Sequence, residues 1–377
     1  MQTFTLGPKI YLGECSVGPV LSECRRVLIV TDKFLHESGK VKYITNYLYE
    51  SKVEFDIYSD IHPDPDIESV MTGLERMKTL DADGIIAMGG GSAIDAAKAI
   101  KYFYETKVAN KHVNFVIIPT TSGTGSEVSN YSIITDNKTH TKHPLVDASL
   151  YADAAILDAG LVVSAPKKIT ADTGIDALTH ALEALVSKNH TDFSDAFAEK
   201  AAKLICENLL EAYEHPTNVQ ARQAVHNAAT MAGAAFSNAG LGLLHAMSHA
   251  FGARFHVPHG RANGILLTYV MNFNAGCSAS LTPVAERYAY IARVLNLDKS
   301  GTRQGALSLI RAVHTLCNKV GIPASIKAAG IDREEFMGMV DDMAEAALND
   351  ATITTNPREC TKEDIKNIYI SAYNGRY

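Results

Sequence analysis

The chain has 377 residues, of which 46% are hydrophobic and 20% are charged, values typical of a folded protein with a substantial core. This length predicts two domains, and the composition argues against disorder and fibrous repeats. Lys and Arg number 35 against 42 Asp and Glu, so the net charge of −7 argues against a general nucleic-acid-binding protein.

The sequence predicts neither a membrane protein nor a secreted, disulfide-bonded one. No window approaches the roughly 18 uninterrupted apolar residues of a membrane span. The first residues lack the basic patch and apolar run of a signal peptide. The cysteines are too widely spaced to suggest paired metal ligands or a disulfide framework: Cys15, Cys24, Cys206, Cys277, Cys317 and Cys360. We therefore expect a cytoplasmic protein with reduced cysteines.

The first 160 or so residues alternate short apolar runs with helical patterns. The apolar runs predict buried strands, and the intervening periodicity predicts helices that include residues 67–77 and 93–103. Strands separated by helices of this length imply a parallel sheet covered on both faces. The predicted strands are 26–31, 53–59, 84–88, 114–118 and 154–157.

The character of the chain changes after about residue 166. The segments that follow are rich in Ala and Leu at helical spacing, at 175–186, 196–213, 219–235 and 303–320. We place a boundary near 162–166, between an α/β domain (1–163) and an all-helical domain (164–377). Clefts between such domains are common sites for small ligands.

A glycine-rich loop separates the strand at 84–88 from the helix that follows it. Gly89, Gly90 and Gly91 let backbone N–H groups approach an anion, and the following helix N-terminus favours negative charge. Ser92 is expected to cap that helix. The loop therefore predicts phosphate binding, and a tight turn without a ligand is the alternative.

Two further features suggest a nucleotide. Asp32 ends the strand at 26–31, where a carboxylate would bind a ribose 2′-OH and repel a 2′-phosphate, which favours NAD over NADP. A cap for the next helix is its alternative role. The second loop, 119–127, contains Thr120, Thr121 and Ser126 beside glycines, a composition that suits hydrogen bonding to a nucleotide, although a solvated loop is also possible.

Acidic and histidine residues cluster in the helical half. Asp176 and His180 are four residues apart, a spacing that places both on one helix face, and His245 and His249 repeat it. His256 and His259 follow closely. An Asp with several imidazoles suits Fe²⁺ or Zn²⁺. A simple helix-surface hydrogen bond is the alternative for the first pair, and spacing alone does not identify the ligands among the later histidines.

These motifs, with Asp95 and Lys98 in the helix after the glycine loop, resemble the iron-dependent (group III) alcohol dehydrogenases over nearly the whole chain. Among them the chain looks similar to propanol dehydrogenases and related short-chain aldehyde reductases. The resemblance implies a dinucleotide-binding (Rossmann-like) α/β domain, a helical metal-binding domain, an active site in the cleft between them, and a homodimer or larger assembly. It implies four metal ligands: Asp176, His180, His245 and His259.

The resemblance also implies roles for other residues. His249 matches a family histidine near the substrate that is usually not a ligand, and it is a candidate proton relay, or else a buried histidine that orients its helix. Lys142 falls where a family lysine reaches the cofactor ribose. The implied NAD(H)-binding residues are Asp32, Gly89, Gly90, Gly91, Ser92, Asp95, Thr120, Thr121, Ser126 and Lys142.

The expected reaction is reversible hydride transfer between NAD(H) and a short aldehyde and its primary alcohol, with Fe²⁺ or Zn²⁺ as a Lewis acid. One alternative is an anionic aldehyde, such as sulfoacetaldehyde reduced to isethionate or succinate semialdehyde reduced to 4-hydroxybutyrate. Arg254 or Arg261 could bind it, although an ion pair or a subunit contact is the expected role of each. A lyase like dehydroquinate synthase and a non-catalytic NAD sensor are both opposed by the ligand set.

Overall fold

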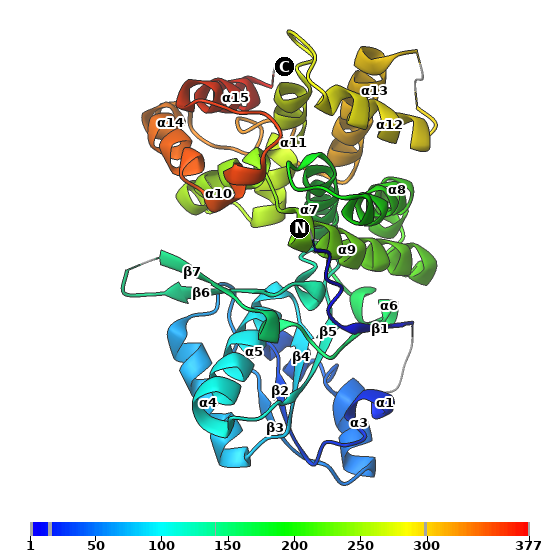
Figure 1. Cartoon of the computed structure of the whole chain (residues 1–377), viewed down its shortest axis with the longest axis vertical. Helices are drawn as coiled ribbons and strands as arrows, with labels where there is room; N and C mark the ends of the chain where they lie inside the picture. The colour runs from blue at the N-terminus through cyan, green and yellow to red at the C-terminus, as the bar shows by residue number, and fades with distance from the viewer. Residues whose placement is uncertain (1–2, 14–16, 140, 298–299, 376–377) are drawn as a thin grey trace. The chain divides into compact units, whose positions relative to one another are not determined.

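The computed structural model describes residues 3–13, 17–139, 141–297 and 300–375. Its contacts divide the chain into two compact units, an α/β unit (Thr5–Ala165) and a helical unit that begins at Pro166 and takes in Thr3 and Phe4 as well. Figure 1 shows the two by colour, blue to green for the first and green to red for the second. The predicted succession of a parallel α/β sheet and an all-helical region is confirmed.

The α/β unit is built on a six-stranded sheet in which all pairings are parallel, in the order β1-β8-β5-β4-β2-β3. Five strands match the predicted segments, but β1 was not predicted. It is a four-residue edge strand with both ends exposed, too short for a periodic signal. The strands are β1 (Lys9–Leu12), β2 (Arg26–Val30), β3 (Glu54–Tyr58), β4 (Gly84–Gly89), β5 (Asn114–Pro119) and β8 (Ala154–Leu157).

Helices cover both faces of this sheet. Successive strand side chains point to opposite faces, so Leu28 packs with α4 (Ile67–Leu80) and α5 (Gly91–Tyr104), whereas Ile29 packs with α2 (Lys33–Glu37) and α3 (Lys42–Glu50). Burial on both faces explains why the strands read as continuous apolar runs. The remaining short helices of the unit are α1 (Gly18–Leu21), η1 (Glu105–Ala109), η3 (Ala148–Leu150) and α6 (Ala159–Val162).

A hairpin that no local pattern in the sequence predicted follows β5. After the turn η2 (Ser126–Val128), the antiparallel strands β6 (Tyr131–Asp136) and β7 (Thr141–Val146) form a separate two-stranded sheet. Figure 1 shows it beside the upper end of α5, and β6 contacts that helix. The hairpin therefore lies near the start of the helix that follows the glycine loop.

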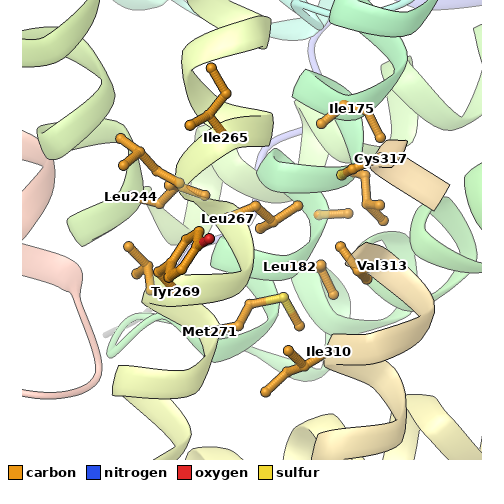
Figure 2. Packing of buried hydrophobic residues seen from close by; sticks show 14 of the residues in the cluster. Ile175, Leu182, Leu244, Ile265, Leu267, Tyr269, Met271, Ile310, Val313 and Cys317 are labelled. Atoms are coloured by element: carbon orange, nitrogen blue, oxygen red, sulfur yellow. The ribbon is translucent and has the colours of Figure 1, made fainter. Parts of the chain in front are cut away.

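The second unit is helical, and its predicted segments correspond to α7, α8, α9 and α13. Side chains from different helices meet in its core, as Figure 2 shows for Leu182, Leu267, Ile310 and Val313. The helices are α7 (Lys167–Val186), α8 (Asp192–Glu214), α9 (Val219–Ala239), α10 (Leu243–Phe255), α11 (His259–Ala275), α12 (Val284–Val294), α13 (Thr302–Lys319), α14 (Arg333–Leu348), η4 (Ala351–Thr355) and α15 (Lys362–Asn374).

None of the helices within the described ranges has the length and hydrophobicity needed to cross a membrane. The cysteines that the structure describes are all free, namely Cys24, Cys206, Cys277, Cys317 and Cys360. Cys15 lies outside the described residues.

Candidate active site

Four side chains from three helices of the helical unit form a group that could hold a metal ion. Asp176 and His180 come from α7, His245 from α10 and His259 from α11, and one ligand atom from each lies within 4.8 Å of the others. The Nε2 atoms of His259, His180 and His245 lie 3.3, 3.9 and 4.0 Å from Asp176 Oδ1. The structure therefore brings together the four residues that the resemblance implied as metal ligands.

A glycine allows α11 to bring its histidine to this group. A Cβ at Gly260 would lie 2.0 Å from the backbone oxygen of Asp172, so only glycine permits the start of α11 to approach α7 this closely. His259 is the first residue of α11 and Asp176 is one turn beyond Asp172 on α7. Close packing of the two helices thus sets the shortest of the three distances.

Glu183, which the sequence analysis did not identify, holds the start of α10. Its carboxylate accepts hydrogen bonds from Gly242 N at 3.0 Å and Leu244 N at 2.8 Å, and its Oε2 lies 2.6 Å from His245 Nδ1. No side chain of α10 itself caps this helix. Glu183 therefore satisfies N–H groups at the helix start and leaves His245 Nε2 directed at the ligand group.

Asn263 is the second residue that the sequence analysis missed. It lies one turn after His259 on α11, and its Nδ2 donates to Asp176 Oδ1 at 2.6 Å. The same nitrogen is 3.2 Å from His259 Nε2 and 3.4 Å from His245 Nε2. Helical spacing could have found both missed residues, because Asn263 is at i+4 from His259 and Glu183 is at i+7 from Asp176.

The electrostatics of the group fit a divalent cation. Burial tends to raise the pKa of the Asp176 carboxyl, but His180, His259 and His245 hold it below its ordinary value. Burial and the neighbouring imidazoles lower the pKa of His245, which keeps the ring in the neutral form that binds metals. Nδ1 of His180 is buried without a hydrogen-bond partner among the described residues. One carboxylate and three imidazoles suit Fe²⁺ or Zn²⁺.

His249 lies one turn after His245 and beside the ligand group. Its ring stacks on that of His259, with centroids 5.4 Å apart, and its Nδ1 is 2.8 Å from Asp350 Oδ2. Asp350 is fixed in turn by Thr352, whose N and Oγ1 donate to its Oδ1. Burial tends to raise the pKa of Asp350, but the hydrogen bonds from His249 and Thr352 hold it well below its ordinary value. No local sequence pattern points to Asp350, which is 101 residues away from its partner His249.

The two arginines near the histidines differ in their surroundings. The Arg261 guanidinium binds Asp172, with Nη2 2.9 Å from Oδ1 and Nε 3.3 Å from Oδ2. Asp172 is buried, so this is an ion pair between α11 and α7. Arg254 lies exposed in the last turn of α10.

The nucleotide-binding candidates gather at one edge of the parallel sheet. Gly89 ends β4 in register with Pro119 at the end of β5, and Thr120 N donates to Gly89 O. Asp32 follows the neighbouring strand β2, and its Oδ2 would be 3.8 Å from a Cβ at Gly89. Ligands of open parallel sheets bind outside the carboxyl ends of the strands, where these loops lie.

Each residue at this edge has a defined local role. Asp32 caps α2, as its Oδ1 accepts from Leu35 N at 2.9 Å. The predicted helix cap at Ser92 is wrong, because α5 begins at Gly91 and Gly90 is its N-cap residue. Gly90 and Gly91 lack a Cβ, so the backbone can begin α5 before Ser92 despite the close second loop. A Cβ at Gly90 would lie 3.4 Å from Thr121, and one at Gly91 would lie 3.0 Å from Thr124, so the two loops are in contact.

Lys142, predicted to reach the cofactor ribose, lies on β7 and pairs with Asp64 of the loop before α4, with Nζ 2.5 Å from Oδ1. Both side chains are more than half exposed. Asp95 and Ser126 bond to each other rather than facing solvent separately, with Ser126 Oγ donating to Asp95 Oδ1 at 2.8 Å.

Comparisons with known proteins agree on one family. The model of the family described as iron-containing alcohol dehydrogenase matches residues 8–159, and that of the Fe-containing alcohol dehydrogenase family, C-terminal, matches residues 170–373. The NADPH-dependent butanol dehydrogenase of Clostridium saccharobutylicum is 40% identical over 100% of this chain and 99% of its own. The 1-propanol dehydrogenase PduQ of Salmonella typhimurium is 42% identical over 98% of this chain and 99% of its own.

One solved structure is also similar to this chain over nearly its whole length. The sulfoacetaldehyde reductase of Bifidobacterium kashiwanohense, crystallised in complex with NAD⁺, superposes with a TM-score of 0.87 at 27% identity, over 99% of this chain and 98% of that one.

Proposed function

The chain belongs to the iron-containing alcohol dehydrogenase family, and we propose that this alcohol dehydrogenase interconverts a short neutral aldehyde and its primary alcohol with NAD(H) and Fe²⁺ or Zn²⁺. The observation that carries the proposal is the group of Asp176, His180, His245 and His259, whose donor set suits either cation. When bound, the cation supplies Lewis acidity at the carbonyl oxygen and NADH supplies the hydride.

The protein's own residues prepare this group for an exchangeable ligand. The side chains of Asp176, His180 and His245 are at most 6% exposed, whereas that of His259 is 41% exposed. Three buried ligands and one at the surface leave one side of the group accessible, as a catalytic metal site requires. We assign substrate access to the side of His259.

His249 is the proposed proton donor and acceptor. The ionised Asp350 carboxylate can only accept, so it fixes the hydrogen of the neutral ring on Nδ1 and leaves the lone pair on Nε2. With its side chain 40% exposed and its ring stacked on His259, Nε2 can exchange a proton between the reacting oxygen and water. Asp350 is a positioning residue in this scheme.

NAD(H) rather than NADP(H) is favoured by Asp32. Its Oδ1 is used in capping α2, while its Oδ2 faces the glycine loop, where a carboxylate accepts a hydrogen bond from a ribose hydroxyl and repels a 2′-phosphate. The Clostridium relative is named NADPH-dependent, and the Bifidobacterium relative was crystallised with NAD⁺. The relatives therefore differ in the cofactor that their names give, and our proposal of NAD(H) rests on the Asp32 carboxylate.

A neutral substrate is favoured because Arg261 is already paired. A bidentate ion pair with buried Asp172 uses the guanidinium edge that a sulfonate or carboxylate would need. The PduQ relative is named for 1-propanol and the Clostridium relative for butanol, both neutral alcohols. An anionic aldehyde, as in the sulfoacetaldehyde reductase, is the second candidate, and exposed Arg254 is then the arginine that we propose to bind it.

We also propose that residues 1–163 bind the cofactor and residues 164–377 the metal. Action in the cytoplasm and assembly into a homodimer or larger oligomer complete the proposal. The free cysteines among the described residues fit a reducing compartment. Gel filtration with light scattering tests the assembly.

The test of the function compares His259→Ala with His256→Asn after loading with Fe²⁺ or Zn²⁺. His256 is exposed with φ of +52°, a conformation that asparagine tolerates, and it lies outside the ligand group. We expect His259→Ala to lose bound metal and aldehyde-dependent NADH oxidation while keeping NADH binding, and His256→Asn to keep all three. Wild-type protein that oxidises NADH with none of ethanal, propanal, butanal and sulfoacetaldehyde would refute the function.

A further inference from the structure

Lys98 is a fully buried charge in the α/β unit. Its Nζ lies within hydrogen-bonding distance of four oxygen atoms, Ser126 Oγ at 3.1 Å, Ser129 O at 2.7 Å, Ser129 Oγ at 3.0 Å and Tyr131 O at 2.8 Å. None of its surface is exposed, so the ammonium cannot touch a bound cofactor. Any effect of Lys98 on the cofactor must pass through the residues it holds.

Asp95, one turn earlier on α5, holds the same region from the other side. Its Oδ1 accepts from Ser126 Oγ at 2.8 Å, and its Oδ2 accepts from Ile133 N at 3.2 Å. Its backbone oxygen accepts from Ser132 Oγ at 2.7 Å. Ser126 therefore lies between the carboxylate and the ammonium and bonds to both.

The residues held in this way belong to segments that the site requires. Ser126 belongs to the second nucleotide loop, and Ile133 and Tyr131 lie on β6 of the hairpin whose β7 contains Lys142. The helix that provides both charges begins at the glycine loop. We propose that Asp95 and Lys98, together the α5 clamp, are positioning residues that fix the second loop and the hairpin against the glycine loop, so that these segments form one preorganised NAD(H) site. This inference rests on the NAD(H) binding proposed above.

The cost of burying these charges indicates that the α5 clamp holds a specific geometry. A buried ammonium is unfavourable unless it is paired and hydrogen-bonded. Burial lowers the pKa of Lys98 to about 8, against the negative charges of Asp95 and Glu127, which favour the protonated form. An apolar side chain could fill the same space. It could not donate hydrogen bonds to the four oxygen atoms from the two segments, which therefore require a donor at this point.

The chain offers a matched control on the same helix. Lys101 is one turn further along α5 and only 1% exposed, and its Nζ bonds Glu105 Oε2 and Ser149 O, each at 2.8 Å. Neither partner belongs to the glycine loop, the second loop or the hairpin. Lys101→Met therefore removes an equally buried ammonium from α5 without freeing a nucleotide-binding segment.

The experiment measures the dissociation constant of NADH for Lys98→Met, Asp95→Asn, the double variant and Lys101→Met. The chain has no Trp, so enhancement of NADH fluorescence is free of indole background. We expect affinity to fall about tenfold or more in Lys98→Met, equivalent to about 1.4 kcal/mol, with the KM for NADH raised and kcat at saturating NADH nearly unchanged. Lys101→Met should bind NADH with an affinity within about twofold of wild type, even if its melting temperature falls as far as that of Lys98→Met.

Asp95→Asn keeps the inference testable if the Lys98→Met variant does not accumulate as folded protein. The amide is isosteric and still accepts from Ser126, but its NH₂ group faces Ile133 N–H, so affinity should fall by severalfold. Because the two residues act as one unit, the double variant should lose no more than Lys98→Met alone.

Three results would overturn the inference: wild-type affinity in Lys98→Met, an equal loss in Lys101→Met, or additive losses in the double variant, which would indicate direct contact between Asp95 and the cofactor. The proposed function fails separately, if the wild-type chain binds neither NADH nor NADPH.

Discussion

Replacing Glu183 by Gln should weaken metal binding by the helical unit. Oε2 of Glu183 accepts from Gly242 N at 3.0 Å and contacts His245 Nδ1 at 2.6 Å, while Leu244 N donates to Oε1 at 2.8 Å. Glutamine fills the same space but has a single acceptor oxygen. In either orientation of the amide, an N–H group at the start of α10 therefore faces an NH₂ group.

The magnitude follows from which bonds survive. The better orientation keeps oxygen at the Oε2 position and loses the bond from Leu244, and a bond to a charged group contributes about 1.5–3 kcal/mol. Burial raises the pKa of Glu183 to about 7, against Leu244 N and Gly242 N, which lower it, so removing the charge returns part of the burial cost. We expect a stability loss near the lower value, and about 10- to 100-fold weaker metal binding, because His245 Nδ1 then donates to a neutral amide oxygen instead of a carboxylate and the start of α10 has lost the bond from Leu244 N.

The assay is a chelator competition titration read by metal content, with thermal unfolding and NADH binding measured in parallel. Glu199→Gln is the control, because Glu199 is a partly buried carboxylate of the same unit whose partner, Tyr290 Oη at 3.2 Å, is not a metal ligand. A metal affinity in Glu183→Gln within twofold of wild type would refute the reasoning, as would an equal loss in the control.

Three further predictions concern the cofactor, the proton and the substrate. Asp32→Ser should raise the ratio of kcat/KM for NADPH to that for NADH by about tenfold or more, as a 2′-phosphate is no longer repelled; an unchanged ratio contradicts the role of this carboxylate. Asp350→Asn should place an NH₂ group opposite His249 Nδ1 and move the ring hydrogen to Nε2, lowering kcat by roughly 10²-fold with metal content unchanged; full activity would exclude the relay. Arg261→Ala should destabilise the protein by about 3–5 kcal/mol through unpaired, buried Asp172, without raising the KM for propanal; selective loss of sulfoacetaldehyde turnover would instead favour an anionic substrate.

Local sequence patterns predicted the strands and the loops that follow them, because burial on both faces of a parallel sheet leaves a continuous apolar run. The same logic placed Asp32, Gly89 and Thr120 directly after predicted strands, and the structure brings them to one edge of the sheet. It missed β1, whose four residues give no periodicity, and the β6–β7 hairpin, in which His143 and Pro144 interrupt an otherwise strand-like segment. Short or irregular strands depend on their partners, which a local pattern does not contain.

At the candidate site, the contacts that could not be predicted from the sequence are mainly those between residues far apart in the chain. Asp176 and His180 lie on one helix and could be paired by spacing, but His249 and Asp350 are joined only by the packing of α10 beside η4. Lys142 is a related case. The resemblance predicted that it reaches the cofactor ribose, but in the structure it forms an ion pair with Asp64, a partner that no sequence pattern indicated.

The two histidines of α10 show how one helix can serve two chemical roles. Each has Nδ1 bound by a carboxylate from another element, Glu183 for His245 and Asp350 for His249, so both present Nε2. Their exposure separates them, because the His245 side chain is 1% exposed and faces the ligand group, whereas that of His249 is 40% exposed. A buried neutral imidazole binds a cation well, and one that reaches water can exchange a proton. One helical turn thus separates the proposed metal ligand from the proposed proton relay.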